Sequence, residues 1–245
     1  MADRAVMKGG IIAAGAGSRL RQAGWTMPKP LVEVAGLPLI GRVIRNFRAA
    51  GITSLVIIFN EQERDCERWV QSQHPDLDLQ ILVKTTASSL ESFREVCVRL
   101  GSGPALISTV DAWCPEDEFV AFVKTVRQYP PDVTVLAVTP LVADERPLWV
   151  AMNPDGRITR IGGDSGEIVT AGMYVVPERA RQLSSMGGPG RLREFLSRLV
   201  TQGEPVYGVV IPNVVDVDRA EDVALAEAMA RKKAGEAAKP QGVAK

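Results

Sequence analysis

The stretch IIAAGAGSRL, Ile11–Leu20, decides how the fold of this chain is interpreted. It continues a short apolar run, Gly9–Ala14, that is typical of a buried strand and ends at Gly15 and Gly17. Glycine lets the backbone turn so tightly that several amide N–H groups point at one phosphate chain. Arg19 adds a permanent charge with planar donors suited to phosphate oxygens. The stretch therefore predicts a strand that opens into a phosphate-binding turn.

Strands and helices alternate after this turn. Apolar spacing predicts a helix at 39–47, a strand at 54–59, a helix around 66–70, a strand at 77–83, a helix at 90–100 and a strand at 105–110. Such alternation implies a parallel sheet covered by helices, with ligands at the carboxyl ends of its strands. The glycine turn and Asp111 both follow such strand ends, so we expect them at one edge of the sheet.

The second half of the chain changes character. Strands are expected at 133–139, 148–152, 157–161, 169–176 and 206–211, and helices at 192–199 and 220–230. Asn153–Gly156 is a turn that predicts an antiparallel hairpin. We therefore expect an α/β fold, a single domain over 1–230 with a mixed, mostly parallel sheet that gains antiparallel strands in its second half. A flexible tail is expected over 231–245.

Composition excludes several classes of protein. The 29 Lys and Arg balance 29 Asp and Glu, which argues against a broad nucleic-acid-binding face. Three cysteines without a Cys-x-x-Cys pattern exclude a disulfide framework or a zinc site of that kind. No apolar run approaches the ~18 residues of a membrane span, and the first residues lack the apolar region of a signal peptide. We expect a cytoplasmic protein with no nucleic acid or membrane partner.

The chain has a single histidine, His74, beside a proline in a stretch typical of a solvated loop. Mechanisms that need a histidine base or a Ser-His-Asp triad therefore have almost nothing to work with. Chemistry in this chain must depend on carboxylates, lysine, arginine and backbone amides.

Three kinds of nucleotide-binding turn compete for the glycine stretch. A P-loop needs Gly-x-x-x-x-Gly-Lys-Ser/Thr, which is absent. A dinucleotide fingerprint needs a third glycine where Leu20 stands, and an acid where the second strand closes with Asn60. A nucleotidyltransferase turn is followed by arginine and then Pro-Lys-Pro, and both are present: prolines flank Lys29 and limit where its ammonium reaches.

On these residues the chain resembles the sugar-phosphate nucleotidyltransferase family. The resemblance lies in AAGAGSRL (13–20), PKPLVEVAGLPLI (28–40), Asp111 after a strand, and VVDVDRAEDVALAEA (214–228). It implies a Rossmann-like fold, a nucleoside triphosphate substrate, Mg²⁺ and release of pyrophosphate. It also implies that Arg19 contacts the β- and γ-phosphates and Lys29 the α-phosphate. The nucleotide-binding residues at the turn would be Ala13, Ala14, Gly15, Ala16, Gly17 and Ser18.

The resemblance places metal-binding carboxylates at Asp111 and in the Asp216-Val217-Asp218 segment, and leaves open which of Asp216 and Asp218 is the ligand. Alternation in an extended segment puts both side chains on one face. Each acid also has a simpler structural role: Asp111 as a turn or helix cap, and Asp218 as a cap of the last helix with Glu221 as its partner.

Base and acceptor recognition are expected from two further segments. Thr86, Ser88 and Ser89 stand where many family members have a glutamine and a Gly-Thr stretch; the alternative is that Ser88 or Ser89 caps the following helix. Thr170 and Gly172 resemble the sugar-contacting strand, although the glycine also suits a strand bulge. The lysine that usually binds the acceptor phosphate is missing, because IGGDSGE (161–167) replaces the Glu-Lys-Pro element.

The sequence thus predicts an enzyme that joins a nucleoside triphosphate to a sugar 1-phosphate or similar phosphorylated alcohol. Three alternatives stay open: a cytidylyltransferase for a phosphorylated polyol or choline-like alcohol, a catalytically silent nucleotide-binding subunit and, more distantly, a nicotinamide-dependent dehydrogenase. The base, the acceptor and the oligomeric state stay open as well, and a homo-oligomer is compatible with the sequence.

Overall fold

The computed structural model of the chain describes residues 7–186, 188 and 190–237. Its centre is a parallel sheet in the order β6-β1-β4-β5, formed by Ala105–Thr109, Lys8–Ala13, Ser54–Phe59 and Asp78–Val83. These strands are rich in β-branched and aliphatic residues because helices cover both of their faces. The predicted parallel, helix-covered sheet is confirmed.

Antiparallel strands extend this sheet in the second half of the chain, as predicted. Strand β11 (Ile168–Val176) pairs antiparallel with β6, and β8 (Thr134–Thr139) pairs antiparallel with β11. The hairpin β9–β10 (Trp149–Met152 and Ile158–Ile161) adds to β11, and β12 (Val206–Val210) runs parallel to β8. Strands from both halves of the chain therefore share one sheet.

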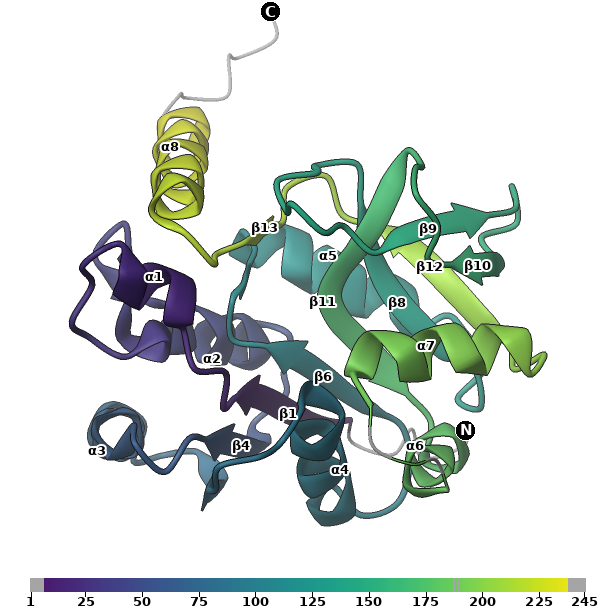
Figure 1. The fold of residues 1–245 in the computed structure, drawn as a ribbon, viewed down its shortest axis with the longest axis horizontal. Helices are drawn as coiled ribbons and strands as arrows, with labels where there is room; N and C mark the ends of the chain where they lie inside the picture. The colour runs from purple at the N-terminus through teal and green to yellow at the C-terminus, as the bar shows by residue number, and fades with distance from the viewer. Residues whose placement is uncertain (1–6, 187, 189, 238–245) are drawn as a thin grey trace, which may run out of the picture.

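Helices form a layer on each face of the sheet (Figure 1). One layer contains α2 (Leu39–Ala49), α3 (Arg64–Gln73) and α5 (Glu116–Val126); the other contains α4 (Ser89–Arg99), α6 (Glu178–Ser185) and α7 (Leu192–Thr201). Apart from the elements of the site described below, the chain also has a small hairpin of β2 (Glu33–Val34) and β3 (Leu37–Pro38). Helix α6 has no counterpart among the predicted elements.

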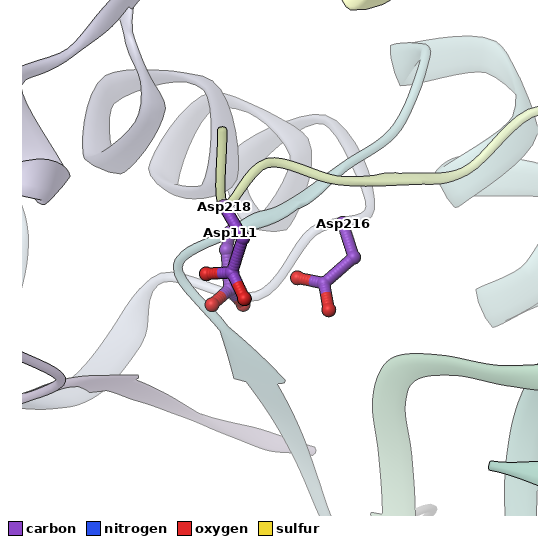
Figure 2. Close-up of side chains that lie close together, drawn as sticks. All are labelled: Asp111, Asp216 and Asp218. Atoms are coloured by element: carbon purple, nitrogen blue, oxygen red, sulfur yellow. The ribbon is translucent and has the colours of Figure 1, made fainter. Parts of the chain in front are cut away.

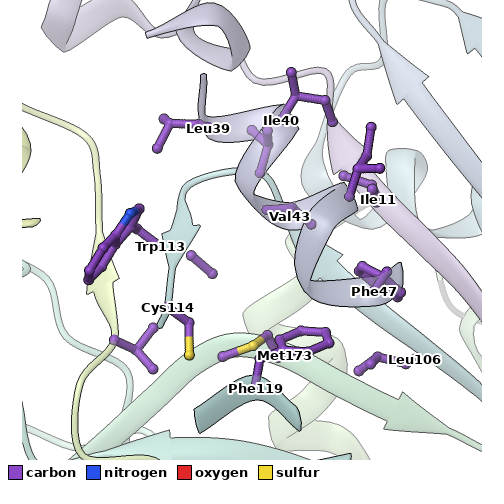
Figure 3. Packing of buried hydrophobic residues seen from close by; sticks show 14 of the residues in the cluster. Ile11, Leu39, Ile40, Val43, Phe47, Leu106, Trp113, Cys114, Phe119 and Met173 are labelled. Atoms are coloured by element: carbon purple, nitrogen blue, oxygen red, sulfur yellow. The ribbon is translucent and has the colours of Figure 1, made fainter. Parts of the chain in front are cut away.

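Two apolar clusters hold the layers together. On one face Phe47 of α2 packs against Phe119 of α5, with ring centroids 5.3 Å apart, over Leu106 and Met173 of the sheet (Figure 3). On the other face Phe93 of α4 meets Phe195 of α7 at 5.5 Å. This close packing fixes the strand ends from which the site is built.

Helix α8 (Ala220–Ala237) continues beyond residue 231, where the tail was expected to begin. Its sequence AEDVALAEAMARKKAGEA is rich in alanine, glutamate, lysine and arginine, which favour helix. The remaining predicted tail, 238–245, lies outside the described residues.

Candidate active site

The glycine turn packs directly against Lys29. After β1 the backbone turns at Gly17, which has φ +57° and precedes the short helix α1 (Ser18–Gln22). A Cβ at Gly17 would lie 2.9 Å from the Cβ of Lys29, so only glycine permits this approach. At Gly15 a Cβ would meet nothing within 4 Å, and Gly15, Ala16 and Ser18 are exposed. The turn therefore presents an open backbone beside a lysine.

Lys29 is a buried cation that joins two distant carboxylates. Lys29 is flanked by Pro28 and Pro30 and begins a 3-10 turn, Lys29–Leu31. Its side chain is only 6% exposed. Its Nζ donates to Asp111 Oδ2 at 2.6 Å and to Asp218 Oδ1. Arg19 Nη1 donates to Asp218 Oδ2 at 2.5 Å. Two basic residues predicted for phosphates thus meet two acids predicted for a metal.

A short strand pair brings the acids together from positions about a hundred residues apart. Strand β7 (Ala112–Trp113) pairs antiparallel with β13 (Val215–Asp216), and the N–H of Val217 donates to the carbonyl of Asp111 at 3.0 Å. Carboxylate oxygens of Asp111, Asp216 and Asp218 lie within 4.8 Å of one another (Figure 2). The structure therefore gathers the three predicted metal ligands in one cluster.

Asp111 lies in a turn, as one alternative predicted, but neither Asp111 nor Asp218 caps a helix with its side chain in the predicted way. Pro115, not Asp111, is the N-cap of α5. At the start of α8 it is the Asp222 carboxylate that accepts from the backbone N–H groups of Asp218, at 3.0 Å, and Arg219, at 2.8 Å. The predicted partner, Glu221, instead contacts the Arg219 side chain at 3.4 Å. Asp222 satisfies the helix start, so the Asp218 side chain is available to the site.

The electrostatics of the cluster follow from one ammonium among three acids. Burial alone would favour neutral forms of Lys29 and Asp111, but their mutual attraction prevails: the pKa of Lys29 is raised and that of Asp111 is lowered. Asp216 faces the cavity, yet neighbouring protein displaces much of its water. This desolvation, followed by the negative charge of Asp111, raises the pKa of Asp216 well above its usual range. The cluster thus holds more acid than the paired cations neutralise.

The donor set fits a divalent cation. Three carboxylates from two backbone segments supply hard oxygen ligands at a mutual spacing that one ion can bridge. A bound cation would also favour the ionised form of Asp216. The side chains that would hold such an ion are those of Asp111, Asp216 and Asp218, with Lys29 now in contact with two of them.

The segment predicted for base recognition connects to the glycine turn through Asn60. Asn60 Nδ2 donates to the carbonyl of Ala14 at 3.5 Å, and Thr85 Oγ1 donates to Asn60 Oδ1 at 3.3 Å. From the sequence, Asn60 was noted only as the residue that stands where a dinucleotide site would need an acid. Its contacts with Ala14 and Thr85 were not predicted, because these residues are distant from Asn60 in sequence.

The three hydroxyls predicted to bind nucleotide have partners within the protein. Thr86 Oγ1 lies 2.6 Å from Ser92 Oγ, and Ser89 Oγ accepts from the N–H of Leu192 at 3.0 Å. Ser88 Oγ accepts from the N–H of Glu91 at 3.2 Å, which confirms the predicted helix cap. Their contact with a nucleotide stays a prediction.

A cavity of about 280 Å³ adjoins the acidic cluster, since Asp111 and Asp216 line it. Thr170 and Gly172, the predicted acceptor residues, line it too. Gly172 has φ +69° at an irregularity of β11, and a Cβ there would lie 2.7 Å from Thr109 Oγ1. The glycine thus serves both a strand irregularity and the cavity wall.

Sequence comparison identifies proteins to which this chain is similar. The sequence model of a family described as "MobA-like NTP transferase domain" matches residues 9–202. An N-acetylmuramate alpha-1-phosphate uridylyltransferase of Neisseria meningitidis is 51% identical over 51 residues, 21% of this chain and 22% of that protein. A mannose-1-phosphate guanyltransferase of Gibberella zeae is 31% identical over 127 residues, 49% of this chain and 35% of its own length. The chain thus spans about a third or less of the curated relatives that it matches here.

Structural comparison extends the likeness to nearly the whole chain. The inositol-1-phosphate CTP transferase from T. maritima superposes with a TM-score of 0.79 at 21% identity, covering 99% of this chain and 100% of the other. This agreement confirms the predicted Rossmann-like fold. Among the described residues, the helices lack the length of apolar sequence that crossing a bilayer would need.

Proposed function

Because this chain belongs to the family of MobA-like NTP transferase domains, we propose that it is a nucleotidyltransferase that joins a nucleoside triphosphate to a sugar 1-phosphate or a similar phosphorylated alcohol. One observation carries the proposal: Lys29, packed on the glycine turn, contacts Asp111 and Asp218 beside a cavity large enough for a second small molecule. The relatives named for uridylyl and guanyl transfer to sugar phosphates support the same reaction class.

In the proposed reaction a phosphate oxygen of the acceptor attacks the α-phosphorus of the triphosphate. A new P–O bond forms there, the bond to the β-phosphate oxygen breaks in line, and pyrophosphate leaves. The acceptor monoester is largely a dianion at pH 7 because its second pKa is about 6. It therefore needs no base, in accord with a site built without histidine.

The chain's own residues address the repulsion between two anions. The amides of the turn and Arg19 face the leaving phosphates, and Lys29 leaves its carboxylates for the α-phosphate, where negative charge grows. Asp111, Asp216 and Asp218 would hold Mg²⁺, which when bound supplies positive charge to the phosphates. Thr170 and Gly172 contact the acceptor, and Thr86, Ser88 and Ser89 contact the base.

A pyrophosphate-release assay tests the function. The protein is incubated with Mg²⁺, each of CTP, UTP, GTP, dTTP and ATP, and a set of sugar 1-phosphates, inositol 1-phosphate and phosphocholine. We expect one nucleotide and one acceptor class to turn over, and Asp111→Asn to lower kcat by about 10²-fold or more. Turnover with CTP and a polyol phosphate or phosphocholine alone would select the cytidylyltransferase alternative. Nucleotide binding without turnover on any acceptor would indicate a silent subunit instead.

A further inference from the structure

The cavity beside the acidic cluster is lined by negatively charged side chains, which repel a phosphate ester, and by one positively charged side chain. Asp111, Asp144 and Asp216 all line it. Among its lining residues in the described part of the chain, Arg193 carries the one basic side chain. An acceptor with a dianionic phosphate needs a cation here, because the surrounding carboxylates would otherwise repel it.

Arg193 has donors available for a ligand. Within the described part of the chain, its guanidinium makes one hydrogen bond, from Nη2 to the carbonyl of Arg146 at 3.3 Å, and no ion pair with a carboxylate. A guanidinium has five N–H donors in a planar fork that matches phosphate oxygens two at a time. The half-buried side chain is thus a charged group whose hydrogen-bonding capacity is largely unused.

The backbone of Arg193 is held in place from both sides. The preceding residue, Leu192, is buried and donates its N–H to Ser89 Oγ on α4 at 3.0 Å. The following residue, Glu194, accepts the N–H of Arg191 at 3.0 Å and closes the first turn of α7. A fixed helix start reduces the freedom that the side chain loses when it binds a ligand.

We infer that Arg193 binds the phosphate of the acceptor, the role for which the sequence offers no lysine in the usual place. This inference rests on the proposed function and adds to it the residue that selects phosphorylated over unphosphorylated alcohols. Arg193 holds the attacking phosphate within the cavity, whereas Arg19 and Lys29 act on the triphosphate. It was absent from the predicted site because no motif marks it: it is one of several arginines in GRLREFLSRLV (190–200).

Ligand binding tests the inference without turnover. Thermal shift and calorimetry compare the wild type, Arg193→Ala and Arg193→Lys with glucose 1-phosphate, inositol 1-phosphate and phosphocholine, each beside its unphosphorylated parent. Arg191→Ala is the matched control. Arg191 carries the same charge and stands two residues before Arg193, but its side chain does not line the cavity. We expect at least one phosphate ester, and not its parent, to bind the wild type. Arg193→Ala should bind it about 10- to 100-fold more weakly, Arg193→Lys should be intermediate, and Arg191→Ala should match the wild type.

Three outcomes would overturn the inference: no phosphate ester binds the wild type, Arg193→Ala binds as the wild type does, or Arg191→Ala loses as much affinity as Arg193→Ala. Kinetics separate this failure from failure of the proposed function. Turnover with an acceptor KM unchanged in Arg193→Ala refutes the role of Arg193 alone. Binding through Arg193 without pyrophosphate release from any nucleotide refutes the proposed reaction and leaves the phosphate site standing.

Discussion

Replacing Lys29 with methionine should destabilise the fold and, at the same time, strengthen the binding of a divalent cation to the free protein. The ammonium lies 2.6 Å from Asp111 Oδ2, also contacts Asp218, and belongs to a side chain that is only 6% exposed. Methionine keeps the unbranched shape of the side chain, is shorter by the terminal nitrogen, and carries no charge. The three carboxylates then face one another with Arg19 as their remaining ion-pair partner.

The magnitude follows from the spacing of the carboxylates. Two unit charges 4.8 Å apart repel by about 3.5 kcal/mol at an effective dielectric constant of about 20. Asp111 and Asp218 are 24% and 32% exposed, so water and proton uptake relieve part of this. We expect a loss of about 2–3 kcal/mol in metal-free buffer. Because no ammonium has to be displaced, Mn²⁺ should bind the variant at least about tenfold more tightly, a difference of about 1.4 kcal/mol.

Urea unfolding with and without Mn²⁺, together with Mn²⁺ titration followed by electron paramagnetic resonance, measures both effects. Lys233→Met is the matched control: Lys233 also contacts two carboxylates, Asp117 at 2.8 Å and Glu118 at 3.0 Å, but away from the site. It should cost at most about 1 kcal/mol and leave Mn²⁺ affinity unchanged. An unchanged Mn²⁺ affinity in Lys29→Met, or a loss of stability that Mn²⁺ does not restore, would refute the inference that the Lys29 ammonium competes with a divalent cation for these carboxylates.

Four other substitutions test the structure through urea unfolding. Gly172→Ala should lower the free energy of unfolding by about 2–4 kcal/mol, because φ is +69° and the added methyl group would lie 2.7 Å from Thr109 Oγ1. Gly15→Ala, where a Cβ would meet nothing within 4 Å, should change it by less than about 1 kcal/mol. Equal effects of the two substitutions would contradict the geometry. Burial raises the pKa of Glu63 from 4.5 to about 7, so the folded protein binds this proton more tightly than the unfolded chain, and stability falls as pH rises from about 4.5 to 7. Glu63→Gln should remove the part of this pH dependence of stability that comes from Glu63. An unaltered dependence of stability on pH would show that Glu63 does not cause it. Ser88→Ala should cost about 1 kcal/mol through loss of the α4 cap, and no loss would show that the cap is dispensable.

The elements of the fold could be predicted because their signals are local. The apolar runs of β1, β4 and β6 and the helical spacing in α2 and α4 each lie within one short window, and the structure confirms them. The alternation of these elements also predicted the parallel sheet and the edge at which the glycine turn and Asp111 meet. Helix α6, with few apolar residues in ERARQLSS, lacked such a signal.

What the sequence determined by itself is therefore the order of the strands and helices, the glycine turn and the kinds of side chain available for phosphate and metal. The tertiary structure alone decided which of these side chains meet. The pairing of β7 with β13 brings Asp216 to Asp111. The contact of Gly17 with Lys29 directs an ammonium between Asp111 and Asp218. The same packing turns Arg193 toward the cavity rather than its neighbour Arg191. Such contacts join residues up to about two hundred positions apart, and local spacing carries no information about them, because they depend on how whole elements pack against one another.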